Sequence, residues 1–259
     1  MTASPHAKQS ELSPMQWGAM PELLGPRHTY RVRRLVALLT SAVARGHILD
    51  AGCGAGTVTE LLARHGYRVT AVDGSAEFVA HVRARLDRAG LAHRAEVFQA
   101  EFGTVELPAG AYDGAICGEV LEHLADDRGA VRAIAHALRS GGVLALSVPA
   151  DPERFDWLDQ WAGHERRYDE SGLRTILEDA GFEIELLSRW GFPFMTLYER
   201  FVQRPGLATA AKQGEGHLVA RAARSAPAVA AFGALFSLDR CVEGRLPLGT
   251  GFLVRARRR

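Results

Sequence analysis

The sequence is poor in cysteine and lacks any familiar metal-binding spacing. Its three cysteines, Cys53, Cys117 and Cys241, are an odd number set far apart among 259 residues. This pattern excludes a disulfide framework and a cysteine-based zinc site. The ten histidines are scattered without an H-E-x-x-H pair, so the sequence predicts no metal. Unpaired cysteines fit a reducing compartment, and we expect a cytoplasmic protein.

An excess of charge of one sign is also absent. The chain carries 31 Lys and Arg against 30 Asp and Glu, a net charge of +1, which gives no field for recruiting nucleic acid or an anionic membrane. The apolar stretch 226–238 is too short to span a bilayer, and the first 16 residues lack a signal-peptide core. We expect no nucleic-acid partner and no membrane insertion, and we expect the final run Arg255–Arg259 to be a solvated tail.

Alternating strand and helix patterns fill the first half of the chain. Short apolar runs predict strands at 47–51, 68–73, 95–99, 112–117 and 142–148, and helical spacing predicts helices near 31–43, 57–65, 76–89 and 127–139. Gly66, Gly90 and the pair Gly141 and Gly142 directly follow these helices, where a left-handed cap is favoured. This alternation predicts a parallel sheet covered by helices on both faces.

The second half of the chain departs from this alternation of strands and helices. A helix is predicted at 169–182 and a strand at 182–190, but the last strand, 250–257, follows only after roughly sixty residues of helical character. We interpret these residues as a helical insert. The predicted organisation is a flexible leader at 1–27, a core at 28–190, a helical cap at 191–248, and a final strand with a basic tail at 249–259.

A glycine-rich turn follows the first predicted strand, in the stretch ILDAGCGAGTVTELLA at 48–63. The dinucleotide fingerprint needs a glycine where Thr57 stands, and a P-loop needs a lysine there, so both phosphate-binding interpretations are weakened. The remaining interpretation is that the turn binds a nucleoside cofactor that has no pyrophosphate. Asp73 ends the second strand about twenty residues later, where a carboxylate in a doubly wound sheet can accept both ribose hydroxyls.

Five segments in order carry a resemblance to a known family: ILDAGCGAG, VDGS, YDGAICGEVLEHL, LRSGGVLALSVP and GHERRYDESGLRTILEDAGF. Over residues 28–190 the chain resembles class I S-adenosylmethionine-dependent methyltransferases, in the group that includes the ubiquinone-type O-methyltransferases. The resemblance implies a doubly wound α/β fold with a seven-stranded, mostly parallel sheet. It also implies the cofactor S-adenosyl-L-methionine and methyl transfer to an O, N or C atom of a small molecule.

The resemblance also implies roles for individual residues around the cofactor. It places the methionine part at the glycine turn, the ribose at the second strand, the adenine after the third strand and the sulfonium after the fourth. A leading helix at 28–34 closes over the cofactor in related enzymes. The residues implied, in that order, are Asp50, Gly52, Cys53 and Gly54; Asp73 and Gly74; Glu101 and Phe102; Cys117, Gly118 and Glu119; and Tyr30 and Arg33.

Two histidines are candidates for the base that removes a proton from the acceptor. His164 lies in a loop expected to overhang the carboxyl ends of the strands, and His123 follows the fourth strand. Each also has a structural interpretation: His164, with Arg166 and Arg167, could hold the loop by hydrogen bonds, and His123 could be a packed or capping residue. The sequence leaves these alternatives open.

Aromatic residues are concentrated between 155 and 198. They predict either a pocket for an aromatic or apolar small molecule or packing between the insert and the sheet. These residues are Trp157, Trp161, Tyr168, Trp190, Phe192, Phe194 and Tyr198. Two rival functions remain beside methyl transfer: a catalytically idle cofactor-binding or scaffold protein of the same fold, and an NAD-dependent oxidoreductase. The sequence predicts no oligomeric state.

Overall fold

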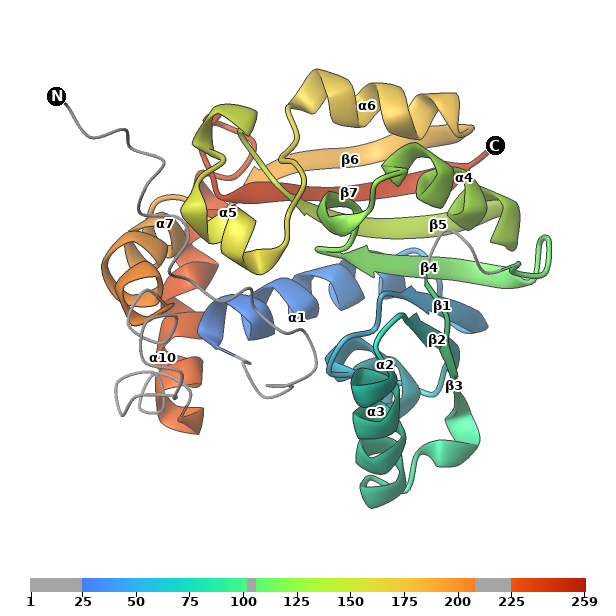
Figure 1. The fold of residues 1–259 in the computed structure, drawn as a ribbon. Coiled ribbons are helices and arrows are strands. Elements are labelled where there is room, and N and C mark those ends of the chain that lie inside the picture. The colour runs from blue at the N-terminus through green and yellow to red at the C-terminus, as the bar shows by residue number, and fades with distance from the viewer. Residues whose placement is uncertain (1–24, 102–105, 208–224) are drawn as a thin grey trace, which may run out of the picture.

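The computed structural model describes residues 25–101, 106–207 and 225–259. A seven-stranded sheet runs through it in the order β3-β2-β1-β4-β5-β7-β6 (Figure 1). The first five strands pair in parallel, and β7 runs antiparallel to both of its neighbours. The strands are β1 His47–Ala51, β2 Arg68–Asp73, β3 Ala95–Gln99, β4 Tyr112–Gly118, β5 Leu138–Pro149, β6 Phe182–Trp190 and β7 Gly251–Arg258. The predicted doubly wound, mostly parallel α/β fold is confirmed.

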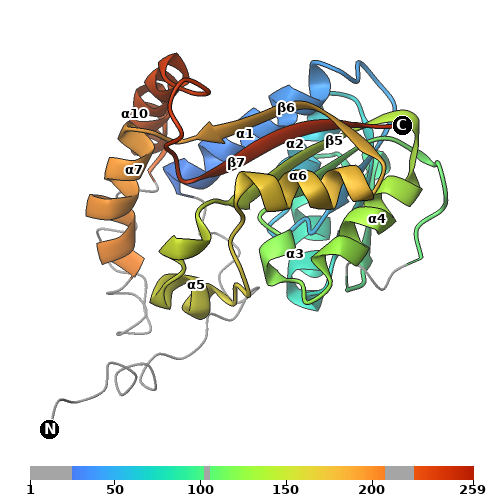
Figure 2. The same cartoon turned by 90° about the horizontal axis from the view of Figure 1, so that it is seen from above.

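Helices cover the sheet on both faces because the central strands are apolar on both sides. In β4, Ile116 packs with the first helix and Cys117 packs with helices on the opposite face. Figure 2 shows α4 and α6 on one side of the strands β5 and β7 and α1 on the other. The helices of the two layers are α1 Pro26–Thr40, α2 Thr57–Arg64 and α3 Ala76–Arg88 on one side, and α4 Asp127–Ala137 and α6 Glu170–Asp179 on the other.

A group of helices lies between β6 and β7, as the predicted insert requires. It comprises α7 Phe194–Tyr198, a π-helical turn at Glu199–Gln203, and α10 Ala226–Ser237; residues 208–224 of the predicted insert lie outside the described residues. Seen from above, α7 and α10 gather at one end of the sheet beside the start of α1 (Figure 2). The carboxylate of Asp239 accepts hydrogen bonds from the backbone N–H groups of Phe194 and Met195 at 2.9 and 3.0 Å. This buried carboxylate therefore fixes the start of α7.

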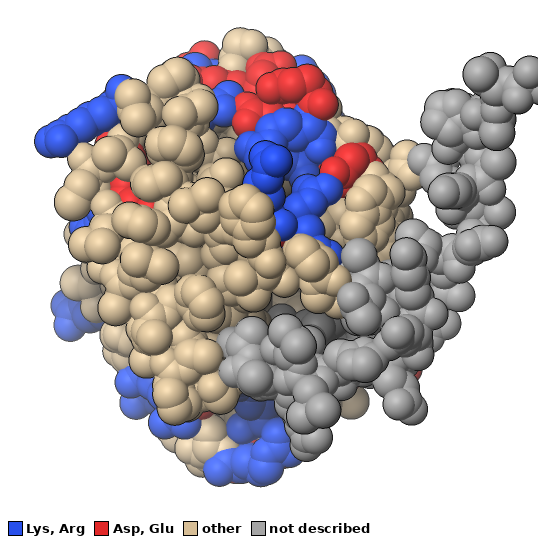
Figure 3. Space-filling view, turned by 90° about the vertical axis from the view of Figure 1, so that its left-hand side faces the viewer, with Lys and Arg blue, Asp and Glu red and all other residues tan. Residues whose placement is uncertain are grey.

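The surface at this end of the molecule is largely uncharged. Figure 3 shows a broad area of neutral side chains, with Lys and Arg atoms gathered beside Asp and Glu atoms along one edge. Phe201, with 67% of its surface exposed, belongs to the insert. No helix among the described residues has both the length and the apolar character needed to cross a bilayer.

Several local predictions were wrong. The helix α4 ends at Ala137, and Gly141 has its positive φ of 73° inside β5, not at a helix cap. All but the last residue of the predicted solvated tail Arg255–Arg259 belongs to β7. Arg255 and Arg257 both pair with Glu185 of the neighbouring strand β6. The helix predicted at 31–43 is α1, which begins five residues earlier, at Pro26.

Candidate active site

A cavity of about 740 Å³ opens at the carboxyl ends of the parallel strands. Its walls come from the turn after β1, the end of β2, the segment after β4, one face of α1, and α5 Trp157–Ala162. The described part of the insert closes a further side. Ligand sites of doubly wound sheets lie at this edge, and most of the predicted cofactor residues line one cavity together with the two predicted catalytic histidines.

The glycine turn forms the cavity floor beside Asp73. The carboxylate of Asp73 accepts the backbone N–H of Gly54 at 2.8 Å and that of Ser75 at 2.9 Å. A β-carbon built on Gly54 would meet nothing within 4 Å, whereas one built on Gly52 would lie 2.4 Å from the Val120 side chain. Both glycines have positive φ. Gly54 therefore leaves room for a ligand, and Gly52 is required by packing as well.

Asp50 is a buried carboxylate at the end of β1 that also lines the cavity. It accepts a hydrogen bond from the Thr59 hydroxyl at 2.5 Å. Burial raises the pKa of Asp50 to about 7, against the lowering effect of that hydrogen bond. Cys53, Gly74 and Glu101 line the cavity too, whereas Phe102, the predicted adenine contact, lies outside the described residues.

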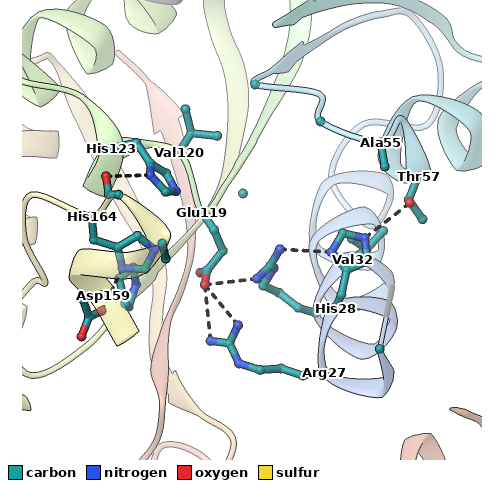
Figure 4. Close-up of a pocket in the computed structure, with 18 of the residues that line it drawn as sticks. Arg27, His28, Val32, Ala55, Thr57, Glu119, Val120, His123, Asp159 and His164 are labelled. Carbon is teal, nitrogen blue, oxygen red and sulfur yellow. Dashed lines mark hydrogen bonds and ion pairs between the residues drawn. The ribbon is translucent and has the colours of Figure 1, made fainter. Parts of the chain in front are cut away.

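Glu119 follows β4 with a positive φ of 59° and points toward α1 (Figure 4). Its Oε2 lies 3.3 Å from Arg27 Nη1 and 3.1 Å from Arg31 Nη1. Burial opposes ionisation of Glu119, but the two guanidinium groups outweigh burial and lower the pKa of this carboxyl to about 2. Gly118 also lines the cavity, but Cys117 does not, because its side chain alternates into the core on the face of α4.

The leading helix faces the cavity with residues other than those expected. Arg27, His28 and Arg31 line the cavity. Arg33 is exposed, and the buried ring of Tyr30 stacks on Trp190 at a centroid distance of 6.2 Å. Tyr30 and Arg33, the contacts predicted from this helix, do not line the cavity, because their side chains lie on other faces of α1.

His164 and His123 meet at the opposite wall of the cavity. Their rings lie edge to face with centroids 4.7 Å apart (Figure 4). The Nδ1 atom of His164 lies 2.8 Å from a carboxylate oxygen of Asp159, which also receives a hydrogen bond from Arg167 at 2.9 Å. Burial opposes ionisation of Asp159, but these two hydrogen bonds lower the pKa of its carboxyl to about 2. An ionised Asp159 therefore orients the imidazole of His164.

His123 is held by the same loop, with Nδ1 3.1 Å from the carbonyl oxygen of Gly163. Burial and the neighbouring His164 lower the pKa of His123, so its imidazole is neutral near pH 7. His164 lines the cavity and its imidazole is hydrogen-bonded to Asp159, a position that fits both the catalytic and the loop-anchoring interpretation, so both stay predictions. The sequence analysis missed Asp159, which follows the capping residue Asp156 of α5.

The aromatic residues divide between the cavity and the core. Trp161 and Tyr198 line the cavity. Trp190 is buried against Tyr30, and Tyr168 is buried with its hydroxyl donating to Asp127 at 2.8 Å. The aromatic residues named from the sequence therefore serve both interpretations: Trp161 and Tyr198 face the cavity, whereas Trp190 and Tyr168 belong to the core on opposite faces of the sheet.

Comparisons with known proteins agree with this geometry. The sequence profile of a family described as "Methyltransferase domain" matches residues 26–187. A "Probable S-adenosylmethionine-dependent methyltransferase" of Mycobacterium tuberculosis is 34% identical over 160 residues, which is 60% of this chain and 54% of that protein. A ubiquinone biosynthesis O-methyltransferase of Xanthomonas euvesicatoria is 34% identical over 159 residues, which is 57% of this chain and 66% of that protein. The chain thus spans between about half and two thirds of the length of these relatives.

Solved structures share the fold. The crystal structure of the cyclase SpnF has a TM-score of 0.61 at 25% identity and covers 87% of this chain and 80% of SpnF. A 1,6-didemethyltoxoflavin N1-methyltransferase of Burkholderia thailandensis, solved with that compound and S-adenosylhomocysteine, has a TM-score of 0.56 at 19% identity. The structural match covers 88% of this chain and 78% of the Burkholderia chain.

Proposed function

The chain belongs to the methyltransferase domain family, and we propose that it transfers a methyl group from S-adenosylmethionine to an O, N or C atom of a small molecule. The observation that carries the proposal is one continuous cavity lined by Asp73 and Gly54 at one end and by His123 and His164 at the other. The first pair suits a nucleoside cofactor, and the second pair suits an acceptor that loses a proton.

The residues around the glycine turn fit S-adenosylmethionine. Asp73 lines the cavity with a carboxylate suited to the ribose hydroxyls, and the open space over Gly54 leaves room for the methionine part. Arg31 is a buried cation in the same cavity and suits the carboxylate of the cofactor's amino-acid end. The bound cofactor would supply a methyl group on a sulfonium, which is already activated for displacement. The protein's task is then to align the acceptor and accept a proton.

The acceptor is proposed to lie against the two histidines. Because Asp159 is ionised and bonded to His164 Nδ1, it favours the tautomer that carries its proton on that atom. The remaining ring nitrogen, Nε2, can then accept a proton from a hydroxyl or amine. Trp161 and Tyr198 add aromatic surface to the cavity, which supports an acceptor with an aromatic or apolar part.

A second candidate is an activity without methyl transfer on the same fold. It is favoured by the similarity to SpnF, a protein described as a cyclase. Under this candidate the chain would bind S-adenosylmethionine but would not consume it. The two candidates share the cofactor site and differ only in what happens beside His164.

Two measurements test the proposal. Calorimetric titration should show one site for S-adenosylhomocysteine and no binding of NAD; binding of NAD alone would contradict the cofactor assignment. Mass spectrometry should then detect S-adenosylhomocysteine formed from S-adenosylmethionine in the presence of fractionated small-molecule extract. Tight cofactor binding with no turnover on any fraction would support the idle or non-methylating candidate.

A further inference from the structure

We propose that His28 is a positioning residue for the amino-acid end of the cofactor, because it holds both the guanidinium of Arg31 and the hydroxyl of Thr57 at one part of the cavity. His28 and Arg31 come from α1, and Thr57 is the first residue of α2, directly after the glycine turn. All three line the cavity. This role rests on the proposed function, and the sequence analysis gave none to His28.

The buried face of α1 brings the two polar residues to the cavity. His28 lies four residues before Val32, and Arg31 lies four residues before Leu35, so each pair shares one face of the helix. Val32 and Leu35 are buried, and they line the cavity together with the two polar residues. The apolar side chains therefore fix the rotation of α1 that turns His28 and Arg31 toward the cavity.

The imidazole of His28 connects α1 to the glycine turn. Its Nε2 lies 3.4 Å from Oγ1 of Thr57, and its Nδ1 lies 3.4 Å from Nη2 of Arg31 (Figure 4). Both hydrogen bonds are long, as hydrogen bonds in a functional site often are before a ligand is bound. One side chain thus touches both groups that face this part of the cavity.

The chemistry of Arg31 decides which ring nitrogen of His28 carries the proton. A guanidinium only donates, so Nδ1 accepts from Arg31 and the proton of the neutral ring lies on Nε2. Nε2 then donates to the oxygen of Thr57, whose own hydroxyl proton can be donated into the cavity. Burial, and after it the charges of Arg31 and Arg27, lower the pKa of His28 to about 3. The ring is therefore neutral near pH 7.

The group that fits these donors is a carboxylate. Arg31 is only 8% exposed, and its Nε has no hydrogen-bond partner among the described residues. No side chain caps the N-terminus of α2, so its positive end faces the same turn. A guanidinium, a hydroxyl donor and a helix N-terminus together favour an anion. The carboxylate of the amino-acid end is the anionic group of S-adenosylmethionine, and the open space over Gly54 leaves room for that end.

His28 acts through its two partners and needs no contact with the cofactor. Nη1 of Arg31 lies 3.1 Å from the carboxylate of Glu119, while its Nη2 faces His28. Loss of the imidazole would leave the guanidinium with Glu119 as its described partner and would leave the Thr57 hydroxyl without its donor. The carboxylate of the cofactor would then meet donors that are no longer oriented toward it.

Titration calorimetry with two ligands tests this role. S-adenosylhomocysteine has the amino-acid end, whereas 5′-methylthioadenosine has the same nucleoside and sulfur atom without it. His28→Phe keeps a ring but removes both nitrogens, and it should weaken S-adenosylhomocysteine binding by about 10-fold, the scale of one hydrogen bond. Its affinity for 5′-methylthioadenosine should stay as in the parent. His28→Gln, whose amide can accept from Arg31 and donate to Thr57, should recover part of the loss.

Thr57→Val gives a second measurement if His28→Phe does not fold. It replaces the hydroxyl by a methyl group and should weaken S-adenosylhomocysteine binding on its own. Because the two residues act in one relay, the double variant should lose little more than either single variant. His47→Phe is the matched control, since Nε2 of His47 lies 2.8 Å from Oγ1 of Thr70, at the end of β1 opposite the glycine turn. It should bind both ligands as the parent does.

The outcomes separate this role from the cofactor assignment. Circular dichroism checks that each variant is folded. Parental affinity of His28→Phe for S-adenosylhomocysteine would overturn the proposal, and so would an equal loss of affinity for both ligands, which would indicate a purely structural role. Additive losses in the double variant would overturn it as well. A parent protein that does not bind S-adenosylhomocysteine would instead contradict the proposed function, and this role with it.

Discussion

Replacing Asp73 by alanine tests the cofactor site most sharply among single substitutions. In the free protein the Asp73 carboxylate already accepts two backbone N–H groups, those of Gly54 and Ser75. It therefore shapes the turn as well as facing the cavity. The substitution removes both functions at once, so its effect on stability must be separated from its effect on cofactor affinity.

The two costs can be estimated. Hydrogen bonds to charged groups contribute about 1.5–3 kcal/mol each when buried, but Asp73 is only partly buried, and we expect the free energy of unfolding to fall by about 1–3 kcal/mol. Loss of the ribose acceptor should cost a further 2–3 kcal/mol of binding free energy, or roughly 30- to 150-fold in affinity for S-adenosylhomocysteine. The affinity loss is the diagnostic one.

Asp113→Ala is the matched control. Asp113 also accepts a backbone N–H, that of His47 at 2.8 Å, together with Arg139 at 2.7 Å, but it lies at the opposite end of the sheet. Urea unfolding should show that both variants lose stability, and calorimetry should show that only Asp73→Ala loses affinity. The reasoning is refuted if Asp73→Ala binds S-adenosylhomocysteine within about threefold of the parent, or if Asp113→Ala weakens binding equally.

Two further substitutions probe the same end of the cavity. Gly54→Ala should reduce cofactor affinity because its β-carbon would point into open cavity space. Gly66 also has a positive φ with open space around it, so Gly66→Ala should lose only stability. Equal affinities of the two variants for S-adenosylhomocysteine, measured by calorimetry, would contradict the assignment. Burial raises the pKa of Asp50 in the native protein from 3.8 to about 7. Between pH 3.8 and pH 7 the native state therefore keeps a proton that the unfolded chain has released. The free energy of unfolding should then fall by up to about 4 kcal/mol as the pH rises across that interval. Urea unfolding at pH 5 and pH 8 should show this loss of stability in the parent and not in Asp50→Asn. An equal change in the free energy of unfolding between the two pH values in parent and variant would exclude the raised pKa.

The first strands of the sheet could be predicted well from sequence, most clearly β1 and β2, which are buried on both faces. The ranges 47–51, 68–73 and 95–99 coincide with β1, β2 and β3. Where burial is one-sided or local signals conflict, prediction failed. The pair Gly141 and Gly142 indicated a helix cap, but pairing of Leu138 with Tyr112 of β4 extends β5 back to Leu138. Tertiary pairing there outweighed the local preference.

The site was only partly predictable for a similar reason. Residues at strand ends, such as Asp73 and Gly118, reach the cavity because the sheet places them there. Which residues of α1 line the cavity depends on the rotation of the helix about its axis, and Tyr30 and Arg33 do not line it. Val32 and Leu35 are recognisable as part of the apolar face of α1, and His28 and Arg31 lie beside them. The meeting of His123 with His164 depends on a loop conformation that no spacing encodes.

The central claim is that one cavity holds the cofactor at the glycine turn and the acceptor at the two histidines. A crystal structure of the protein with S-adenosylhomocysteine tests it most directly. The account predicts the ribose against Asp73, the amino-acid part over Gly54, and the sulfur directed toward His123 and His164. A ligand bound with its sulfur directed away from the two histidines, or bound outside this cavity, would contradict the account.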